Sequence, residues 1–304
     1  MSGLAAVTGA TGFVGPHLIA ALARRGWRLR LLVRRWTPLP SLIGVNAEIV
    51  WGDLSEEQAL GRLVDGADAV VHAAGLIKAQ RAEDFLAVNR DGTARLSAAA
   101  PRALLLLLSS LAAREARLSP YAASKRAAED VLAGRAGPWC AVRAPAVYGP
   151  GDRETLTYFR MAARGFALRP NRADARLSLI HVEDLAEALA LGLDRPPPAS
   201  IYEIDDGREG GYSHFDMAAA AAAALRRPVR SIPVPRPVID AIAHVNARRP
   251  SSQILTPGKV RELFHSDWVA NDRRLAAALD FAPRYPLAPG FRHTISWYRR
   301  HGWL

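Results

Sequence analysis

The sequence reads Thr8-Gly9-Ala10-Thr11-Gly12-Phe13-Val14-Gly15 near its start, and this stretch decides the fold. It follows an apolar run at 4–8, which we predict as a strand, and it opens a helical pattern at 13–25. The first glycine permits a tight turn, the second lets backbone N–H groups approach a pyrophosphate, and the third lets the helix lie close to the sheet. The glycines are spaced one residue more widely than in the commonest glycine motif of dinucleotide-binding proteins, but their position between a strand and a helix indicates a dinucleotide site.

Strand-like and helix-like segments alternate through the first half of the chain. The predicted strands are 28–33, 48–51, 69–73, 103–109, 139–143 and, further on, 201–204. The predicted helices are 56–64, 84–99, 122–133, 183–192 and 218–225. Because the strands are almost wholly apolar, we expect an α/β fold with a doubly wound parallel sheet (Rossmann) covered on both faces.

The pattern changes after residue 150, where the alternation loosens and proline becomes frequent. We therefore predict two domains. Residues 1–150 form the NAD(P)-binding Rossmann domain. Residues 151–304 form a smaller substrate-binding lobe that packs on the first domain and returns some segments to its sheet.

Composition excludes several classes of protein. Of 304 residues, 50% are hydrophobic and 23% are charged, as in a globular protein, and no apolar stretch approaches the roughly 20 residues that span a bilayer. The single cysteine, Cys140, excludes a disulfide framework. The first residues lack the basic region of a signal peptide, so we expect a cytoplasmic protein. The eight histidines show no ligand spacing, and no metal is predicted.

The net charge of +11 comes from 40 Lys and Arg residues against 29 Asp and Glu residues. Such a charge suits nucleic acid, an anionic membrane surface or an anionic ligand. The arginines are spread in pairs along the chain rather than gathered in one block. This favours solvated helix faces, and we expect a small-molecule substrate, no nucleic acid and no integral membrane association.

The ends of the predicted strands supply further candidate cofactor contacts. The second strand ends in Arg34 and Arg35 with no carboxylate nearby, and arginine accommodates the 2′-phosphate of NADP, so we favour NADP(H) over NAD(H). Asp53, followed by Leu54, comes after the third strand and could accept a hydrogen bond from the adenine amino group. The small residues Ala73-Ala74-Gly75 follow the fourth strand and let the backbone pass close to the cofactor.

A candidate catalytic set follows the fifth strand. Tyr121 and Lys125 stand four residues apart and share one face of a helix. A cation near a phenol favours the phenolate, so Tyr121 could act as a general acid or base, while Lys125 could also hold the nicotinamide ribose. Ser109-Ser110 ends the strand upstream, where a hydroxyl could donate to a substrate carbonyl.

These motifs together resemble the short-chain dehydrogenase/reductase superfamily, in its extended, epimerase/dehydratase-like branch. The segments that carry the resemblance are Thr8–Gly15, Gly52-Asp53-Leu54, Val70–Gly75, Val88-Asn89, Ser109-Ser110, Tyr121–Lys125, Arg143–Asp152, Ile180–Ala186 and the ending from Trp297 to Leu304. The resemblance implies that Tyr121 is the acid/base, Lys125 its partner and Ser110 the carbonyl-orienting hydroxyl, with Ser109 as the fallback. It also implies that Pro145 and Val147 line the nicotinamide carboxamide pocket.

The implied activity is an NADP(H)-dependent hydride transfer between nicotinamide and a secondary alcohol or ketone of a small to medium organic substrate. Ala146 occupies a place where nucleotide-sugar enzymes of this branch commonly carry asparagine, which weakens that assignment. A nucleotide-sugar epimerase or dehydratase with tightly held NAD(P) remains an alternative, as does a non-catalytic NADP(H)-binding scaffold or redox sensor.

Several further positions carry weaker expectations. Lys78 would face the substrate if the strand-end geometry holds, and Arg176 could meet an anionic substrate group or form a surface ion pair. His181 is expected to be a packing residue rather than a catalytic one. Since family members often pair the helices beside the active site, the resemblance also suggests a homodimer through 84–99 and 122–133.

Overall fold

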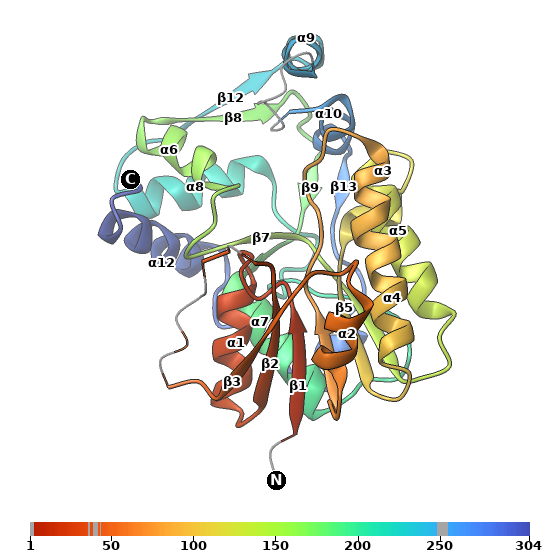
Figure 1. Ribbon diagram of the computed structural model, residues 1–304. Coiled ribbons are helices and arrows are strands. Elements are labelled where there is room, and N and C mark those ends of the chain that lie inside the picture. Colours follow the sequence, from red (N-terminus) through yellow and green to blue (C-terminus); the bar gives the residue numbers. More distant parts are fainter. Residues whose placement is uncertain (1–2, 36, 39–41, 43, 248–254) are drawn as a thin grey trace. The chain divides into compact units, whose positions relative to one another are not determined.

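A seven-stranded parallel sheet forms the centre of the first part of the chain (Figure 1). Its strands are β1 (Leu4–Thr8), β2 (Arg28–Val33), β3 (Ala47–Trp51), β4 (Ala69–His72), β5 (Leu104–Ser110), β6 (Trp139–Ala144) and β11 (Ile201–Glu203). Their order is β11-β6-β5-β4-β1-β2-β3, so the direction of winding reverses between β1 and β4. The doubly wound sheet predicted from the sequence is confirmed, and open sheets of this kind bind ligands outside the carboxyl ends of their strands, at such a reversal.

Helices cover both faces of this sheet (Figure 1). One face carries α1 (Gly15–Arg24) and α7 (Val182–Asp194), which are joined by ion pairs from Arg25 to Glu187 and to Asp194 at 2.5 and 2.6 Å. The other face carries α2 (Glu57–Val64), α4 (Asp91–Ala99) and α5 (Pro120–Ala133). Leucines of these three helices pack on strand residues in one buried cluster that includes Leu60, Leu63, Leu96, Leu132, Val70 and Leu105. The inner strands β1, β4 and β5 are nearly continuous apolar runs because both of their faces are buried, whereas β2 and β3, toward one edge, expose Arg28, Glu48 and Trp51.

The predicted helix at 84–99 is not continuous. It consists of α3 (Ala82–Phe85), a π-helical turn η1 (Leu86–Arg90) and α4. A π turn inserts one extra residue into the helical ladder, and such turns occur frequently at functional sites. The extra residue changes which side chains face α5, and it places Asn89 in the interior.

The structure describes residues 3–35, 37–38, 42, 44–247 and 255–304, and these form two compact units. Unit 1 contains the central sheet and comprises 1–143, 186–203 and 272–281, with α11 (Arg274–Leu279) in its last segment. Unit 2 comprises 144–185, 204–271 and 282–304. Strand β11 thus returns to the central sheet from the second half of the sequence.

Unit 2 is built from short strands and five helices of the described residues. Its strands are β7 (Ala146–Tyr148), β8 (Phe166–Pro170), β9 (Arg176–Leu177), β10 (Leu179–His181), β12 (Arg230–Val234) and β13 (Asp267–Trp268), which form three parallel pairs, β10-β7, β12-β8 and β13-β9. Its helices are α6 (Leu156–Ala163), α8 (His214–Leu225), α9 (Arg236–Ala247), α10 (Pro257–Leu263) and α12 (Leu287–Arg300). Aromatic rings from three elements form the core, where Phe291 meets Tyr148 and Phe159 edge to face at 5.2 and 4.9 Å.

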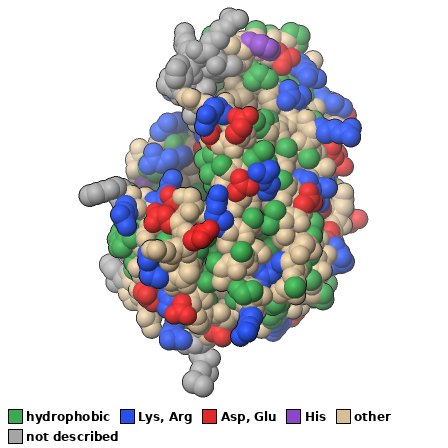
Figure 2. Space-filling view, turned by 45° about the vertical axis from the view of Figure 1, so that its right-hand side comes forward, with side chains coloured by type: hydrophobic (Ala, Val, Ile, Leu, Met, Phe, Trp, Pro, Cys, Tyr) green, Lys and Arg blue, Asp and Glu red, His purple; other side chains and the backbone are tan. Residues whose placement is uncertain are grey.

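The surface shows how the excess positive charge is distributed. Figure 2 shows Lys and Arg side chains scattered over the visible face and interleaved with Asp and Glu. On this face the charge does not gather into one large basic patch, as the paired arginines of the sequence predict. Among the residues that the structure describes, no helix combines the length and the apolar character needed to cross a membrane.

Candidate functional site

The glycine loop forms a close-fitting cradle at the end of β1. Gly9 has φ of +80°, a left-handed conformation that favours glycine, and a Cβ there would lie 2.6 Å from the backbone of Ala73. A Cβ at Gly15 would lie 2.2 Å from the carbonyl oxygen of Ala10. Helix α1 begins at Gly15 and has no acidic residue in its first turn. The positive end of its dipole therefore suits an anionic group such as a pyrophosphate.

A buried hydrogen-bonded chain that the sequence analysis missed supports this cradle. His72, at the end of β4, is fully buried, with Nδ1 2.7 Å from the Thr8 hydroxyl and Nε2 3.1 Å from that of Thr93. The Thr93 hydroxyl donates to the Asn89 carbonyl, and the Thr8 hydroxyl accepts from the Ala74 N–H. Burial, aided by the nearby positive charge of Lys125, lowers the pKa of His72 to about 3. A neutral His72 thus links Thr8, just before the glycine loop, to Thr93 of α4, and Thr8 in turn holds Ala74.

The ends of β2 and β3 hold the residues predicted to contact adenosine. Arg34 and Arg35 follow β2 and are exposed. The Asp53 carboxylate accepts the backbone N–H and the hydroxyl of Ser55 at 2.7 and 2.6 Å. These two hydrogen bonds, together with the charge of Arg34, lower the pKa of Asp53 below its usual value. Leu54 packs against Gly92, where a Cβ would lie 2.8 Å from its Cδ1.

Helix α5 positions Tyr121 and Lys125. Ser119 caps the helix by accepting the Ala122 N–H, and Pro120 occupies its first turn. Tyr121 is half-buried beside Phe85, with ring centroids 6.2 Å apart. The buried ammonium of Lys125 donates to the Leu108 carbonyl on β5 at 2.7 Å. Desolvation lowers the pKa of Lys125 to about 8, against the opposing charge of Glu129.

The two serines at the end of β5 have different surroundings. The buried hydroxyl of Ser109 donates to the Glu129 carboxylate at 2.5 Å. Successive strand residues point to opposite faces, so Ser110 points away from Glu129. The Ser110 hydroxyl is half-buried and accepts the Ala112 N–H at 3.2 Å as the cap of a short 3₁₀ turn, η2 (Leu111–Glu115).

Glu129 joins three elements behind these serines. Its carboxylate is fully buried and binds the Arg143 guanidinium in two-point fashion, with Nε–Oε1 and Nη2–Oε2 distances of 2.9 and 2.7 Å. The pair connects α5 to β6, and the Ser109 hydrogen bond adds β5. Despite the desolvation of Arg143, its hydrogen bonds and its charge interaction with Glu129 raise the pKa of the guanidinium. Glu129 is not among the residues predicted above, although it stands four residues after Lys125, a spacing that places both side chains on one face of a helix.

Asn89 fixes the loop that follows Ala73-Ala74-Gly75. Its side-chain carbonyl accepts the Leu76 N–H at 2.7 Å, and its amide donates to the Leu76 carbonyl and to the Ser124 hydroxyl. A Cβ built on Gly75 would lie 3.2 Å from the Asn89 Oδ1 and 3.6 Å from the Lys125 Nζ. Gly75 therefore lies close to Asn89 and Lys125, and its predicted contact with the cofactor remains a prediction.

The remaining predicted residues are Pro145, Val147, Arg176 and Lys78. Pro145 and Val147 belong to unit 2, in or beside β7, and their predicted contact with nicotinamide remains a prediction. Arg176, on β9, forms an exposed ion pair with Asp216 at 3.6 Å, the second of the two arrangements expected for it. Lys78 lies half-buried in the loop after β4, and its predicted contact with the substrate also remains untested.

Unit 2 brings together three side chains that are not grouped by their spacing in the sequence. Ligand-type atoms of His181, Glu183 and His293 lie within 4.8 Å of one another. The Nε2 of His181 is 3.3 Å from the Nδ1 of His293, while its Nδ1 accepts the Glu183 N–H at 3.3 Å. Tyr285 packs on His181, with ring centroids 4.1 Å apart. His181 thus has the packing and hydrogen-bonding surroundings that the sequence analysis expected.

The fold and the site of unit 1 define a dinucleotide-binding protein of the Rossmann class, with serine, tyrosine and lysine side chains on β5 and α5. Comparison with known proteins makes this assignment narrower. The pattern of the NAD dependent epimerase/dehydratase family matches residues 5–204, and the chain belongs to this family. The resemblance drawn from the sequence motifs is confirmed.

Individual relatives are similar over the whole chain. A ceramide reductase from Caulobacter vibrioides is 44% identical over 311 aligned residues, which cover 99% of this chain and 96% of that protein. The crystal structure of gox2253 matches with a TM-score of 0.81 at 23% identity, covering 100% of both chains. UDP-glucose 4-epimerase from Thermus thermophilus, in complex with NAD, matches with a TM-score of 0.71 at 22% identity and covers 97% of this chain and 99% of that one. The family and its reductase-named members support an NAD(P)-dependent enzyme.

Proposed function

We propose that this protein is an NADP(H)-dependent reductase of the extended short-chain type, acting on a keto group of a ceramide-like lipid. The observation that carries the substrate assignment is the 44% identity, across 99% of the chain, to the Caulobacter ceramide reductase. The reduced nicotinamide, when bound, supplies a hydride to the carbonyl carbon. The product is the secondary alcohol, and the chain's own residues have to deliver one proton to the carbonyl oxygen.

The described side chains suit that proton transfer. Tyr121 donates its hydroxyl proton to the carbonyl oxygen, as the general acid of the reaction. Ser110 orients the carbonyl by donating a hydrogen bond, because the Ser109 hydroxyl is already committed to Glu129. Lys125, held by the Leu108 carbonyl, carries a positive charge below pH about 8 and stabilises the negative charge that develops on Tyr121.

The cradle and the strand ends support the cofactor part of the proposal. Gly9, Gly12 and Gly15, with the backbone of Thr11, Phe13 and Val14, would hold the pyrophosphate at the start of α1. Arg34 and Arg35 are exposed beyond β2, where a carboxylate would favour NAD and a guanidinium accommodates the 2′-phosphate of NADP. The Asp53 carboxylate already accepts two hydrogen bonds from Ser55, which keeps it in place beside the third strand.

The test combines cofactor binding with turnover. We expect tighter binding of NADPH than of NADH by calorimetric titration. We also expect loss of the reduced-nicotinamide absorbance when a ceramide oxidised to the ketone at its secondary alcohol is added in detergent. Arg34→Ala should weaken NADPH binding about tenfold or more and leave NADH binding unchanged, since charged hydrogen bonds contribute roughly 1.5–3 kcal/mol. Arg28→Ala, at the opposite end of β2, is the matched control.

Three outcomes would overturn the proposal. Preference for NADH in the native protein would remove the role of Arg34. Turnover of a nucleotide sugar without added reductant, together with co-purifying NAD, would instead indicate an epimerase or dehydratase. A Tyr121→Phe variant equal to the native protein in every assay would indicate a non-catalytic NADP(H)-binding protein.

A further inference from the structure

Helix α9 in unit 2 carries two separate apolar stripes. The first, Ile239 and Ala243, is buried and packs with Val260 and Phe264 of the α10 segment. The second consists of Val238, Ile242 and Val245, whose exposed fractions are 48%, 47% and 51%. At about 100° per residue, these three side chains fall within an arc of roughly 60° on the helix. The exposed stripe is therefore a continuous band along the helix.

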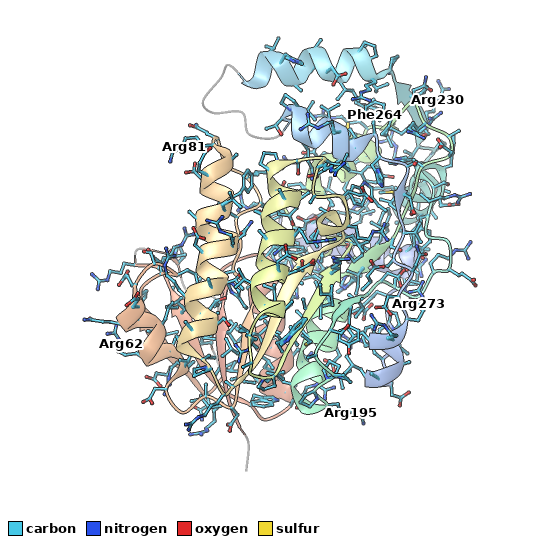
Figure 3. The ribbon with its side chains drawn as sticks, turned by 90° about the vertical axis from the view of Figure 1, so that its right-hand side faces the viewer. Arg62, Arg81, Arg195, Arg230, Phe264 and Arg273 are labelled. Atoms are coloured by element: carbon cyan, nitrogen blue, oxygen red, sulfur yellow. The ribbon has the colours of Figure 1, made fainter. Side chains whose placement is uncertain are left out.

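Other described elements leave this band uncovered. In Figure 3, α9 runs lengthwise along the edge of unit 2, with α10 and the labelled Phe264 beneath it, and Figure 1 shows the same placement end-on. Arg236 and Asp240 lie on a different face of α9, where they form an ion pair at 3.5 Å. One helix thus has a face for the protein interior, a polar face and a third face that is apolar and open.

The neighbouring sheet repeats the pattern. In the β12-β8 pair, Ile232 lies directly opposite Leu168, and both side chains are exposed, at 42% and 45%. Because opposed residues of two paired strands point to the same face, the two side chains form one small apolar surface. Strand β12 leads into α9 through Pro235 alone. Exposed apolar side chains therefore lie on two successive elements of the chain.

This part of the sequence is also strongly basic. Residues 226–263 contain eight Lys and Arg against two Asp and Glu, so they contribute six of the eleven net positive charges of the chain. Among them, Arg230 and Arg236 on β12 and α9 and Lys259 and Arg261 on α10 are exposed. Open apolar side chains on a helix surrounded by basic residues are typical of segments that lie in the interface of an anionic membrane.

We propose that α9, with the exposed stripe Val238, Ile242 and Val245, docks the protein reversibly on the surface of an anionic phospholipid bilayer. The apolar stripe enters the boundary between headgroups and acyl chains, while the basic residues attract the negative surface. The docking surface follows from α9 itself. The role that we give it, access to a lipid substrate held in the bilayer, rests on the proposed function.

The experiment is co-sedimentation of the full chain with vesicles of phosphatidylcholine alone or mixed with phosphatidylglycerol. We expect binding to the anionic vesicles that weakens as salt is raised. The triple variant V238S/I242S/V245S should lower the partition coefficient about tenfold or more, because it removes the apolar groups that would enter the bilayer. The matched control is Phe215→Ser, another side chain of unit 2 with an exposed fraction of 48%. Unchanged NADPH binding by the triple variant shows that it is folded.

Three results would contradict the inference. They are absence of binding to anionic vesicles, equal binding by the native protein and the triple variant, and a dimer in solution that the triple variant converts to monomers, since a second copy would then cover the stripe. A ketone substrate with short, soluble chains separates the two proposals. Reduction of this substrate without vesicle binding refutes docking and leaves the proposed function intact. Vesicle binding without reduction of any ceramide ketone refutes the proposed function and leaves docking intact.

Discussion

Replacement of Glu129 by glutamine tests the link between stability and chemistry in this fold. Glutamine keeps the size of the side chain and removes its charge. The Arg143 guanidinium, whose side chain is 13% exposed, then faces a neutral amide whose NH₂ group cannot accept its hydrogen bonds. The Ser109 hydroxyl loses a charged acceptor at the same time. The variant therefore leaves a largely buried guanidinium without its two-point partner, and the Glu203 carboxylate, 4.0 Å away, is its remaining ion-pair contact.

The expected loss of unfolding free energy is about 3–5 kcal/mol, the usual effect of removing one member of a buried ion pair. This is a large fraction of the roughly 5–15 kcal/mol that stabilises a typical domain, so the variant should fold but unfold at markedly lower denaturant concentration. Glu48→Gln is the control. Glu48 pairs with Arg30 at 2.8 Å but its side chain is 62% exposed, so its loss should change stability by less than about 1 kcal/mol.

The same substitution should change the pH dependence of turnover. The charge of Glu129 raises the pKa of Lys125 against the effect of burial, and the result is about 8. Lys125 loses its proton as pH rises through that value, so the native activity should fall above pH about 8. Without Glu129 the pKa of Lys125 decreases further, and the alkaline limb of the rate profile should move to lower pH.

Urea unfolding and a pH profile of kcat provide the two measurements. If the unfolding free energy of Glu129→Gln lies within about 1 kcal/mol of the native value, the Glu129–Arg143 pair does not stabilise the fold as a buried ion pair. If the alkaline limb of the rate profile stays at the same pH or moves to higher pH, Glu129 does not raise the pKa of Lys125.

Three further predictions concern the described site. Ser110→Ala should lower kcat by about 10²-fold or more. Ser109→Ala should keep most of the activity and instead lose about 1–3 kcal/mol of unfolding free energy, measured by urea unfolding. The opposite ranking of the two kcat values would make Ser109 the catalytic hydroxyl. The neutral form of His72 stabilises the fold above pH 6.5, and as pH falls from 6.5 toward about 3 this stabilisation should decrease by about 1.4 kcal/mol per pH unit. The His72→Gln variant should therefore show a flatter dependence of unfolding free energy on pH in acid unfolding. An unchanged slope would show that other groups dominate. Gly15→Ala should lower the stability of the protein by about 1–3 kcal/mol and weaken NADPH binding, because its Cβ would meet two backbone carbonyl oxygens at 2.2 and 2.4 Å. Gly61→Ala in α2 is the control, since its Cβ would meet nothing within 4 Å, and it should be neutral or stabilising in thermal melts.

The class of fold and the region of the cofactor site could both be predicted from the amino-acid sequence. The reason is that both signals are local. Apolar strands alternating with amphipathic helices specify a parallel sheet, and the carboxyl ends of parallel strands meet at one edge. A glycine loop, a strand end rich in arginine and a Tyr-x-x-x-Lys pair could therefore be assigned to one region from their order along the chain. The bounds of the central strands lie within one residue of those predicted.

Groups that look alike in the sequence are distinguished by their contacts in the folded chain. Ser109 and Ser110 are chemically identical neighbours, and the difference between them arises because Glu129, twenty residues after Ser109, accepts a hydrogen bond from one and not from the other. The neutral His72 depends on burial, which no local pattern reveals, and the π turn at Asn89 interrupts a regular helical pattern.

The same holds for α9. Its sequence shows apolar residues around much of the helix, and nothing in that pattern tells Ile239 from Ile242. Packing on α10 covers the first and leaves the second exposed. A sequence encodes local preference, whereas the choice between two apolar faces depends on which one reaches a partner from a distant part of the chain.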